Sequence, residues 1–193
     1  DAYVVELSKL QRQIIHNTRR LGQKKVDSAI ETIELLNPDV TVKTYAMRLT
    51  PENIGDLIEE YDFVVDGVDN FETKFLINDA CVLAGKPFCH GGILRFQGQV
   101  MTYVPGQGPC YRCIFGEVPE DNAPAPIPVI GVTAGIIGTI QAAEAIRYLL
   151  GIPSLLTGKL LVLDGLRMQF RTVPFPHVSE HCPLHTRKGV TDL

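Results

Sequence analysis

Segments with the apolar spacing of a helix alternate along this chain with short apolar runs typical of strands. Residues 24–36 carry apolar side chains at helical spacing, whereas Asp62 to Asp66 is a short apolar run bounded by acids. Apolar residues recurring every three to four positions indicate an amphipathic helix, and a short bounded run suits a strand buried on both faces. Such alternation favours an α/β fold, in which strands and connecting helices build one layered sheet.

The same patterns place further elements along the chain. Helices are expected at residues 50–61, from Asn70 to about Gly85 and at 133–150, and strands at 40–45, 87–90, 160–164 and 168–173. Residues 93–104 resemble antiparallel β structure that turns around Gly98. We therefore expect a mixed sheet flanked by helices, with a C-terminal antiparallel extension, in a single domain without internal repeats.

Composition excludes several classes of protein. The 193 residues are 45% hydrophobic and 21% charged, which is typical of a soluble globular domain. A net charge of −4 gives no basic field for nucleic acid. The longest uncharged stretch of the C-terminal half, residues 122–143, contains prolines and glycines and predicts a loop and a buried helix, with no membrane span.

The cysteines point to a reducing compartment. Five cysteines, an odd number, occur without the features of a secretory signal, so reduced thiols in the cytoplasm are expected. Cys81 falls within an expected helix and Cys89 within an expected strand. We interpret both as core residues, and His90 as structural.

Three charged residues are candidates for a phosphate or metal site. Asp69 lies between a buried strand and a helix N-terminus, where it could hold a divalent cation, although capping the helix is the commoner role. Lys25 opens a helix, where a cation is unfavourable against the helix dipole unless it meets an anion, although a solvated lysine is the commoner explanation. Arg12 lies not far from the pair Arg19-Arg20.

Seven segments in order give these residues a context. They are DAYVVELSKLQRQ, GQKKVDSA, LNPDVTV, VVDGVDNFETKFLIND, GQVMTYVPG, PCYRC and GVTAGIIGTIQAAEAIRYLLG. Together they resemble the ThiF/MoeB/HesA family, relatives of ubiquitin-activating enzymes, across essentially the whole chain. The resemblance implies a Rossmann-like adenylation domain spanning residues 1–193. It also implies a cytoplasmic homodimer that uses ATP and Mg²⁺ to adenylate the C-terminal glycine of a small ubiquitin-like sulfur-carrier protein in thiamine- or molybdopterin-type chemistry.

The resemblance also implies a role for each site residue. Asp1 resembles the acid that binds the ribose, Ser8, Lys9, Leu10, Gln11 and Arg12 the phosphate-contacting segment, Lys25 a second phosphate cation, and Asp69 the magnesium-linked acid with Asn70 beside it. These residue types suit the reaction, because a carboxylate that attacks the α-phosphate meets negative charge, which an arginine, a lysine and a cation offset. No protein nucleophile is needed.

This sequence departs from the family pattern in three places. The glycine-rich nucleotide loop and its strand would precede residue 1, so the chain reads as the C-terminal three-quarters of an enzyme. Lys9 stands where relatives have asparagine. Residues 116–128, where many relatives carry a cysteine for a covalent link, contain none, so no thioester is expected there.

These departures leave a second functional class open. The alternative is a non-catalytic relative that serves as a dimer partner or carrier-binding module. A nicotinamide-dependent oxidoreductase is a distant third, because no G-x-G-x-x-G is present.

A metal site is predicted from two distant motifs. Cys110 and Cys113 are separated by two residues, and so are Cys182 and His185. Three thiolates and an imidazole at this spacing are typical of a closed, structural zinc site. The alternatives are a redox pair, which the proline-glycine loop before the cysteines disfavours, and unliganded thiols. His181 is a poorer fourth ligand because it adjoins Cys182.

Overall fold

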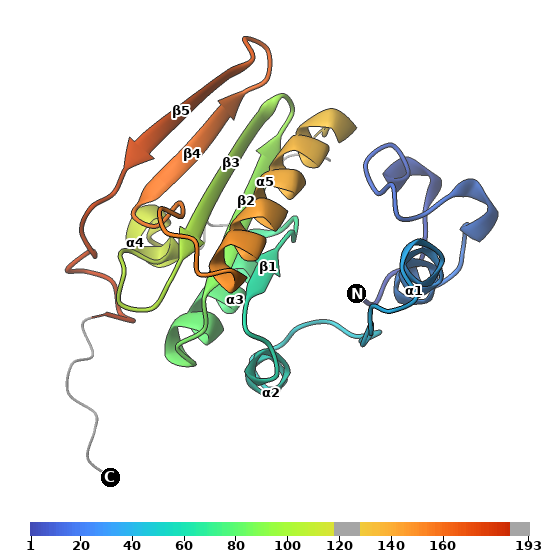
Figure 1. Cartoon of the computed structure of the whole chain (residues 1–193), viewed down its shortest axis with the longest axis horizontal. Coiled ribbons are helices and arrows are strands. Elements are labelled where there is room, and N and C mark those ends of the chain that lie inside the picture. The colour runs from blue at the N-terminus through green and yellow to red at the C-terminus, as the bar shows by residue number, and fades with distance from the viewer. Residues whose placement is uncertain (118–127, 186–193) are drawn as a thin grey trace. The chain divides into compact units, whose positions relative to one another are not determined.

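The computed structural model describes residues 1–117 and 128–185, which form two compact units (Figure 1). The first unit consists of Asp1–Leu49 with Ile130–Val132, and the second of Thr50–Val129 with Thr133–Leu193.

The first unit is organised around helix α1 (Lys25–Leu36), which follows the 3-10 helices η1 (Leu7–Lys9) and η2 (Thr18–Arg20). The backbone of Val5 pairs with that of Gln23, and the Val5 side chain is buried. The strand expected at residues 40–45 is wrong: residue 40 lies in a bend and residues 41–45 belong to no strand. An apolar alternation forms a strand only beside a partner that completes its hydrogen bonds, and within residues 1–49 no strand lies alongside it.

The second unit contains the sheet. Its strands are β1 (Val64–Asp66), β2 (Phe88–Leu94), β3 (Gln97–Tyr103), β4 (Lys159–Asp164) and β5 (Gln169–Pro174). They lie in sequence order, with β1 parallel to β2 and the remaining pairs antiparallel. The prediction of a mixed α/β sheet with an antiparallel extension is therefore confirmed.

The turn between β2 and β3 differs from the prediction. It falls at Arg95 and Phe96, whereas Gly98, the expected turning point, lies inside β3 opposite Ile93. A Cβ atom on Gly98 would lie 2.5 Å from side-chain carbons of Ile137. This glycine therefore permits close helix–sheet packing, which is another common use of glycine in a strand.

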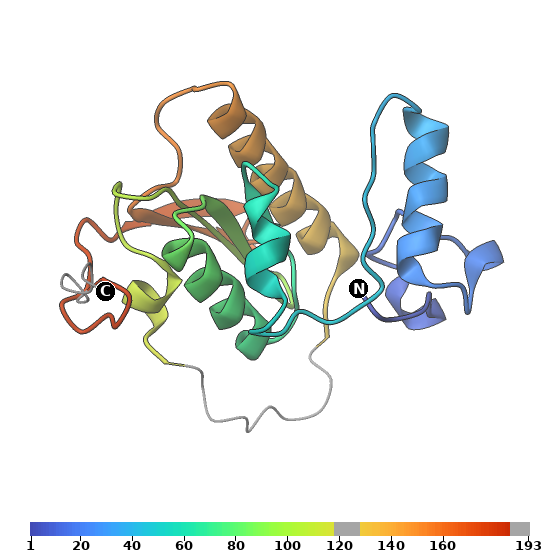
Figure 2. The same cartoon turned by 90° about the horizontal axis from the view of Figure 1, so that it is seen from below.

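Helices cover both faces of the sheet (Figure 2). They are α3 (Phe71–Leu83), α4 (Tyr111–Phe115) and α5 (Gly131–Leu149), whereas α2 (Ile54–Glu59) packs against α3. On one face Ile137 of α5 packs in a buried cluster with Cys89, Val100 and Leu163. On the other face Tyr111 of α4 contacts Phe75 of α3, with ring centroids 4.9 Å apart.

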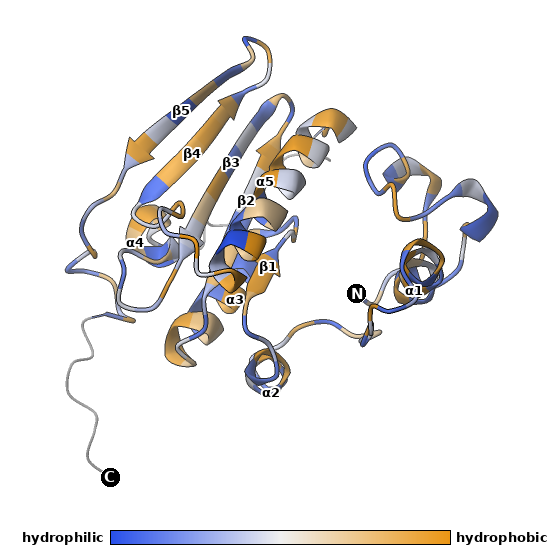
Figure 3. Cartoon of the chain, viewed as in Figure 1, coloured by the Kyte–Doolittle hydropathy of each residue, from blue (hydrophilic) through white to orange (hydrophobic). Residues whose placement is uncertain are grey.

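The expectation that the run from Asp62 to Asp66 is buried on both faces is wrong for β1, because the apolar Val65 is 51% exposed whereas Asp66 is 2% exposed. Figure 3 shows β1 and much of β4 as apolar.

Helix α2 begins at Ile54 rather than near Thr50, because Asn53 Oδ1 accepts a hydrogen bond from the Thr50 amide in a preceding turn. Among the described residues, no helix has the length and apolar character needed to cross a membrane.

Candidate nucleotide and metal sites

A hollow of about 380 Å³ in the first unit brings together three of the predicted site residues. It is lined by Asp1, Arg12, Gln13, Ile14, Ile15, His16, Lys25, Val26 and Ala29. The Lys25 ammonium lies 3.5 Å from Asp1 Oδ2. Ser8, Lys9, Leu10 and Gln11, the rest of the predicted phosphate segment, do not line this hollow.

Two structural features make the hollow attractive to an anion. Lys25 is the first residue of α1, so its ammonium and the positive end of the helix dipole act in the same place. Arg12 follows η1, and its guanidinium is anchored only weakly, at 3.5 Å from the Ser8 carbonyl oxygen. Two cations and a helix N-terminus beside a single carboxylate favour binding of a phosphate group.

A hydrogen-bonded network fixes the wall of the hollow to α1. Thr32 Oγ1 donates to the Ile15 carbonyl at 2.7 Å, and His16 Nδ1 lies 2.8 Å from Ser28 Oγ. Arg20 donates to both the Ser28 carbonyl and Thr32 Oγ1. Burial, reinforced by the charges of Lys25 and Arg20, lowers the pKa of His16 and favours its neutral form.

Asp69 and Asn70 lie in the second unit, between β1 and α3. Asn70 is the N-cap of α3, and its Oδ1 accepts a hydrogen bond from the Thr73 amide at 2.8 Å. The commoner of the two roles weighed for Asp69, capping, is therefore wrong, because its neighbour performs it. The Asp69 carboxylate is exposed beside the start of the helix, which leaves it available to a ligand.

A buried ionic cluster lies beneath this loop, and the sequence patterns did not reveal it. Asp66 Oδ2 lies 2.7 Å from His90 Nδ1 and 3.3 Å from the Lys74 ammonium. The side chains are 2%, 1% and 8% exposed, respectively. Burial raises the pKa of Asp66, but the hydrogen bond from His90 and the charge of Lys74 outweigh burial and hold that pKa below its ordinary value. Burial lowers the pKa of both His90 and Lys74.

Four side chains from two distant segments could hold a metal ion. One ligand atom from each of Cys110, Cys113, Cys182 and His185 lies within 4.8 Å of all the others. His185 Nε2 is buried and, among the described residues, has no hydrogen-bond partner. A hydrogen bond with Cys110 lowers the pKa of Cys113, which favours the thiolate form that binds a metal ion.

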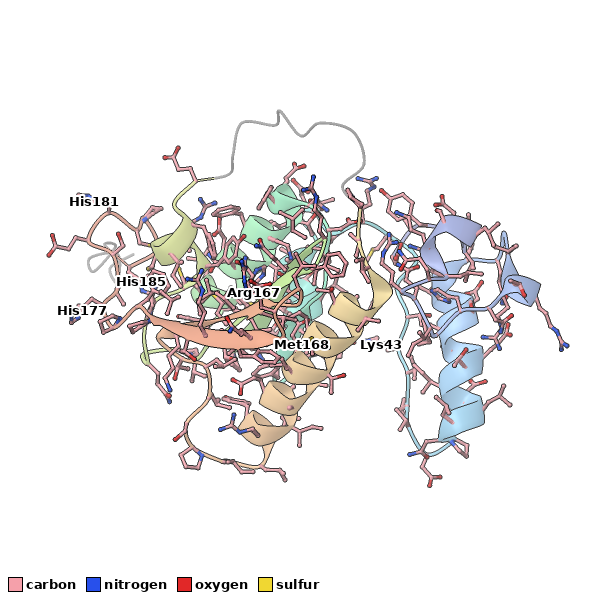
Figure 4. All side chains as sticks on the ribbon, turned by 90° about the horizontal axis from the view of Figure 1, so that it is seen from above. Lys43, Arg167, Met168, His177, His181 and His185 are labelled. Carbon is pink, nitrogen blue, oxygen red and sulfur yellow. The ribbon has the colours of Figure 1, made fainter. Side chains whose placement is uncertain are left out.

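The rejected alternatives at this site need one correction. His181 is exposed and is not part of the cluster; in Figure 4 it lies at the outer edge of this end of the molecule, with His185 further in. The proline-glycine loop does not by itself disfavour a redox pair, since the cysteines that follow it open a short helix: Cys110 is the N-cap of α4 and Cys113 lies within it. Convergence of all four ligands, rather than the preceding loop, is what favours a metal over a redox pair.

The two remaining cysteines are in the core. Cys81 in α3 and Cys89 in β2 are both fully buried. Burial raises the pKa of each thiol to about 12. Neither thiol is reactive at neutral pH, because the thiolate is the nucleophile.

Comparison with known proteins places the chain in a family. Residues 1–184 match the ThiF family. The chain is 42% identical to the SAMP-activating enzyme E1 of Haloferax volcanii, covering all of the chain and 72% of that protein. It is 42% identical to the sulfur carrier protein adenylyltransferase of Thermus thermophilus (93% of the chain, 69% of that protein). It is 43% identical to the adenylyltransferase and sulfurtransferase MOCS3 of Sus scrofa, covering all of the chain and 43% of that protein.

A solved structure shares the fold. The crystal structure of E. coli MccB with MccA-N7isoASN superposes with a TM-score of 0.81 at 17% identity, covering 95% of this chain and 57% of that one. Fold and relatives together define an α/β protein of the adenylyltransferase class. The chain belongs to the ThiF family.

Proposed function

We propose that this protein uses ATP to adenylate the C-terminal carboxylate of a small ubiquitin-like sulfur-carrier protein. The observation that carries the proposal is the gathering of Arg12, Lys25 and Asp1 around one hollow. A scaffold has no physical need for two cations and an acid at a helix N-terminus. Relatives about 42% identical that are named as activating enzymes or adenylyltransferases support the same activity.

The reaction assigns a role to each cation. A carboxylate oxygen of the carrier attacks the α-phosphorus, the bond from that phosphorus to the β-phosphate oxygen breaks, and pyrophosphate leaves. Arg12 offers a planar fork of donors and Lys25 a point charge, and both offset the charge that gathers on the phosphates. Asp1 binds the ribose, a role that requires it to exchange its contact with Lys25 for the sugar hydroxyls.

Asp69, with Asn70 beside it, is the proposed magnesium-linked acid and belongs to the second unit. Asp69 would hold a magnesium ion that enters with ATP, and this ion would offset the negative charge of the phosphates. The exposed Asp69 carboxylate supplies the oxygen ligand that such a hard cation prefers. The phosphate-contacting segment remains a prediction for Ser8, Lys9, Leu10 and Gln11. Of these four residues, Ser8 contacts Arg12 through its carbonyl oxygen.

We also propose that the metal held by the cysteine–histidine cluster is Zn²⁺ in a structural role. A tetrahedral zinc–sulfur distance of about 2.3 Å implies sulfur atoms about 3.8 Å apart. The Cys110 sulfur lies 3.7 Å from that of Cys113 and 3.8 Å from that of Cys182. Four protein ligands leave no open position for a substrate, which supports a structural rather than catalytic ion.

Localisation and assembly complete the proposal. All five cysteines are free of disulfides, which supports the cytoplasm. Exposed apolar residues of α5, such as Ile146 and Leu149, support a homodimer. Light scattering of the purified protein tests the dimer, since a monomeric mass at micromolar concentration contradicts it.

ATP–pyrophosphate exchange with and without candidate carriers tests the function, using the protein with any residues that precede Asp1. Arg12→Ala and Lys25→Ala should each lower the carrier-dependent rate by ~10²-fold or more, the usual cost of losing one such donor. Lys24→Ala is the matched control, because Lys24 is an exposed neighbour that does not line the hollow. Carrier binding without exchange in any form of the protein would instead identify a non-catalytic carrier-binding module.

A further inference from the structure

Contacts from several elements fix Asp66, the last residue of β1. Its Oδ2 contacts His90 and Lys74, and its Oδ1 accepts a hydrogen bond from the Val68 amide at 2.9 Å. Its carbonyl oxygen accepts a further hydrogen bond from Gln141 Nε2 at 2.7 Å. Strand β2 and helices α3 and α5 thus converge on the residue that ends β1.

Lys74 connects this carboxylate to the next strand. Its ammonium donates to the Gly91 carbonyl of β2 at 2.9 Å as well as to Asp66. Burial lowers the pKa of Lys74, whereas the negative charges of Asp66 and Asp69 act in the opposite direction. One buried cation therefore joins the Asp66 carboxylate to the backbone of β2.

These contacts leave the Asp69 backbone little freedom. Asp66 fixes the loop on one side through the Val68 amide, and Asn70 fixes it on the other through the Thr73 amide. Only Asp69 lies between the two anchored positions, although Gly67 would otherwise make this loop flexible.

Stability alone does not explain a buried ion pair at this position. Replacing such a pair with neutral side chains of similar volume is often neutral or even stabilising, whereas removing one partner is costly. A function that depends on the geometry of the loop accounts for its presence. Residues that orient a metal ligand from behind have a large effect on metal affinity.

We propose that Lys74 and His90 are positioning residues that, by fixing Asp66, hold the Asp69 carboxylate in the orientation in which it binds a divalent cation. The inference rests on the proposed function, since it assumes that Asp69 binds that cation. Lys74 and His90 touch neither nucleotide nor metal in this account. They act only through Asp66 and the loop that follows it.

Binding of Mn²⁺, followed by electron paramagnetic resonance with a non-hydrolysable ATP analogue, tests this inference without relying on turnover. The double variant Asp66→Asn/Lys74→Met removes both charges and keeps similar volumes, so it should fold. We expect its Mn²⁺ affinity to fall ~10- to 100-fold, the usual cost of losing an orienting partner. Lys86→Met is the matched control: this lysine precedes β2 and binds the carbonyls of Glu59 and Tyr61, so Mn²⁺ affinity should not change.

Asp69→Asn distinguishes failure of this inference from failure of the proposed site. Weak Mn²⁺ binding by Asp69→Asn together with wild-type binding by the double variant overturns the positioning role alone. Wild-type binding by Asp69→Asn overturns the metal role of Asp69 and the inference with it. If the double variant does not fold, His90→Gln supplies the comparison, because it loses one hydrogen bond to Asp66 and keeps the ion pair. Wild-type Mn²⁺ affinity in His90→Gln then overturns the inference.

Discussion

Replacing Cys182 with serine removes one ligand of the predicted zinc site and should sharply lower the stability of the second unit. The ion joins α4 to a segment near the C-terminus, and the closed loop from Cys113 to Cys182 spans 69 residue steps (182 − 113). Treated as a cross-link, a loop of this length restricts the unfolded chain by about 4 kcal/mol. In a protein of this size, that loss corresponds to a fall in the melting temperature of ~8–16 °C.

Thermal unfolding followed by circular dichroism, paired with elemental analysis for zinc, measures both consequences. Wild-type protein should contain one zinc per chain, and adding a chelator should lower its melting temperature by the same ~8–16 °C. Cys182→Ser should contain no zinc, and its melting temperature should not change when the chelator is added. Cys81→Ala is the control: this buried thiol lies outside the cluster, so zinc should stay at one per chain even if packing suffers. Full zinc content in Cys182→Ser, or an unchanged melting temperature, would refute the reasoning.

Three further outcomes are expected. Burial lowers the pKa of His90, so the imidazole stays neutral in the folded protein as the pH falls below about 6.5. In the unfolded chain the same imidazole binds a proton in this range, so the free energy of unfolding falls by up to ~1.4 kcal/mol per pH unit. Equilibrium urea unfolding of His90→Gln should show a flatter pH dependence, and an identical slope contradicts this. Gly98→Ala should destabilise the protein by ~1–3 kcal/mol in the same assay, because its new Cβ overlaps Ile137; wild-type stability would contradict that packing. Mass spectrometry after incubation with ATP and carrier should find no thiol-sensitive adduct in residues 116–128, of which 118–127 lie outside the described residues; an adduct on Cys81 or Cys89 would show that a core thiol had been misread.

Local patterns predicted most of the elements because burial repeats with the period of the structure. The helix at 24–36 and the strand at 160–164 each agree with the structure to within one residue. The strand at 40–45 failed because pairing is not a local property. The turn at Gly98 failed because a glycine signals either a turn or a close contact, and only Ile137, 39 positions away (137 − 98), shows which applies.

Some residues of the candidate sites could likewise be predicted from the sequence, whereas others could not. Cysteine spacing predicted the metal ligands, since the chemistry of the ion restricts both the residue types and their separation. Asp66 and Lys74 gave no such signal, because an aspartate at a strand end and a lysine in a helix are usually solvated. The pairing of Asp66 with Lys74 depends on how α3 packs against the sheet. The contact between Asp66 and His90 likewise depends on the pairing of β1 with β2. Gln13 and His16 were also missed, although they lie one and four residues beyond Arg12 in the wall of the same hollow.

The central claim is that a carrier carboxylate attacks the α-phosphorus of ATP, and oxygen isotope transfer tests it most directly. A carrier whose C-terminal carboxylate is labelled with oxygen-18 is incubated with the protein and ATP, and the activated carrier is then cleaved with hydroxylamine. The account predicts AMP that contains one labelled oxygen and pyrophosphate that contains none. Unlabelled AMP, or label in pyrophosphate, would contradict it.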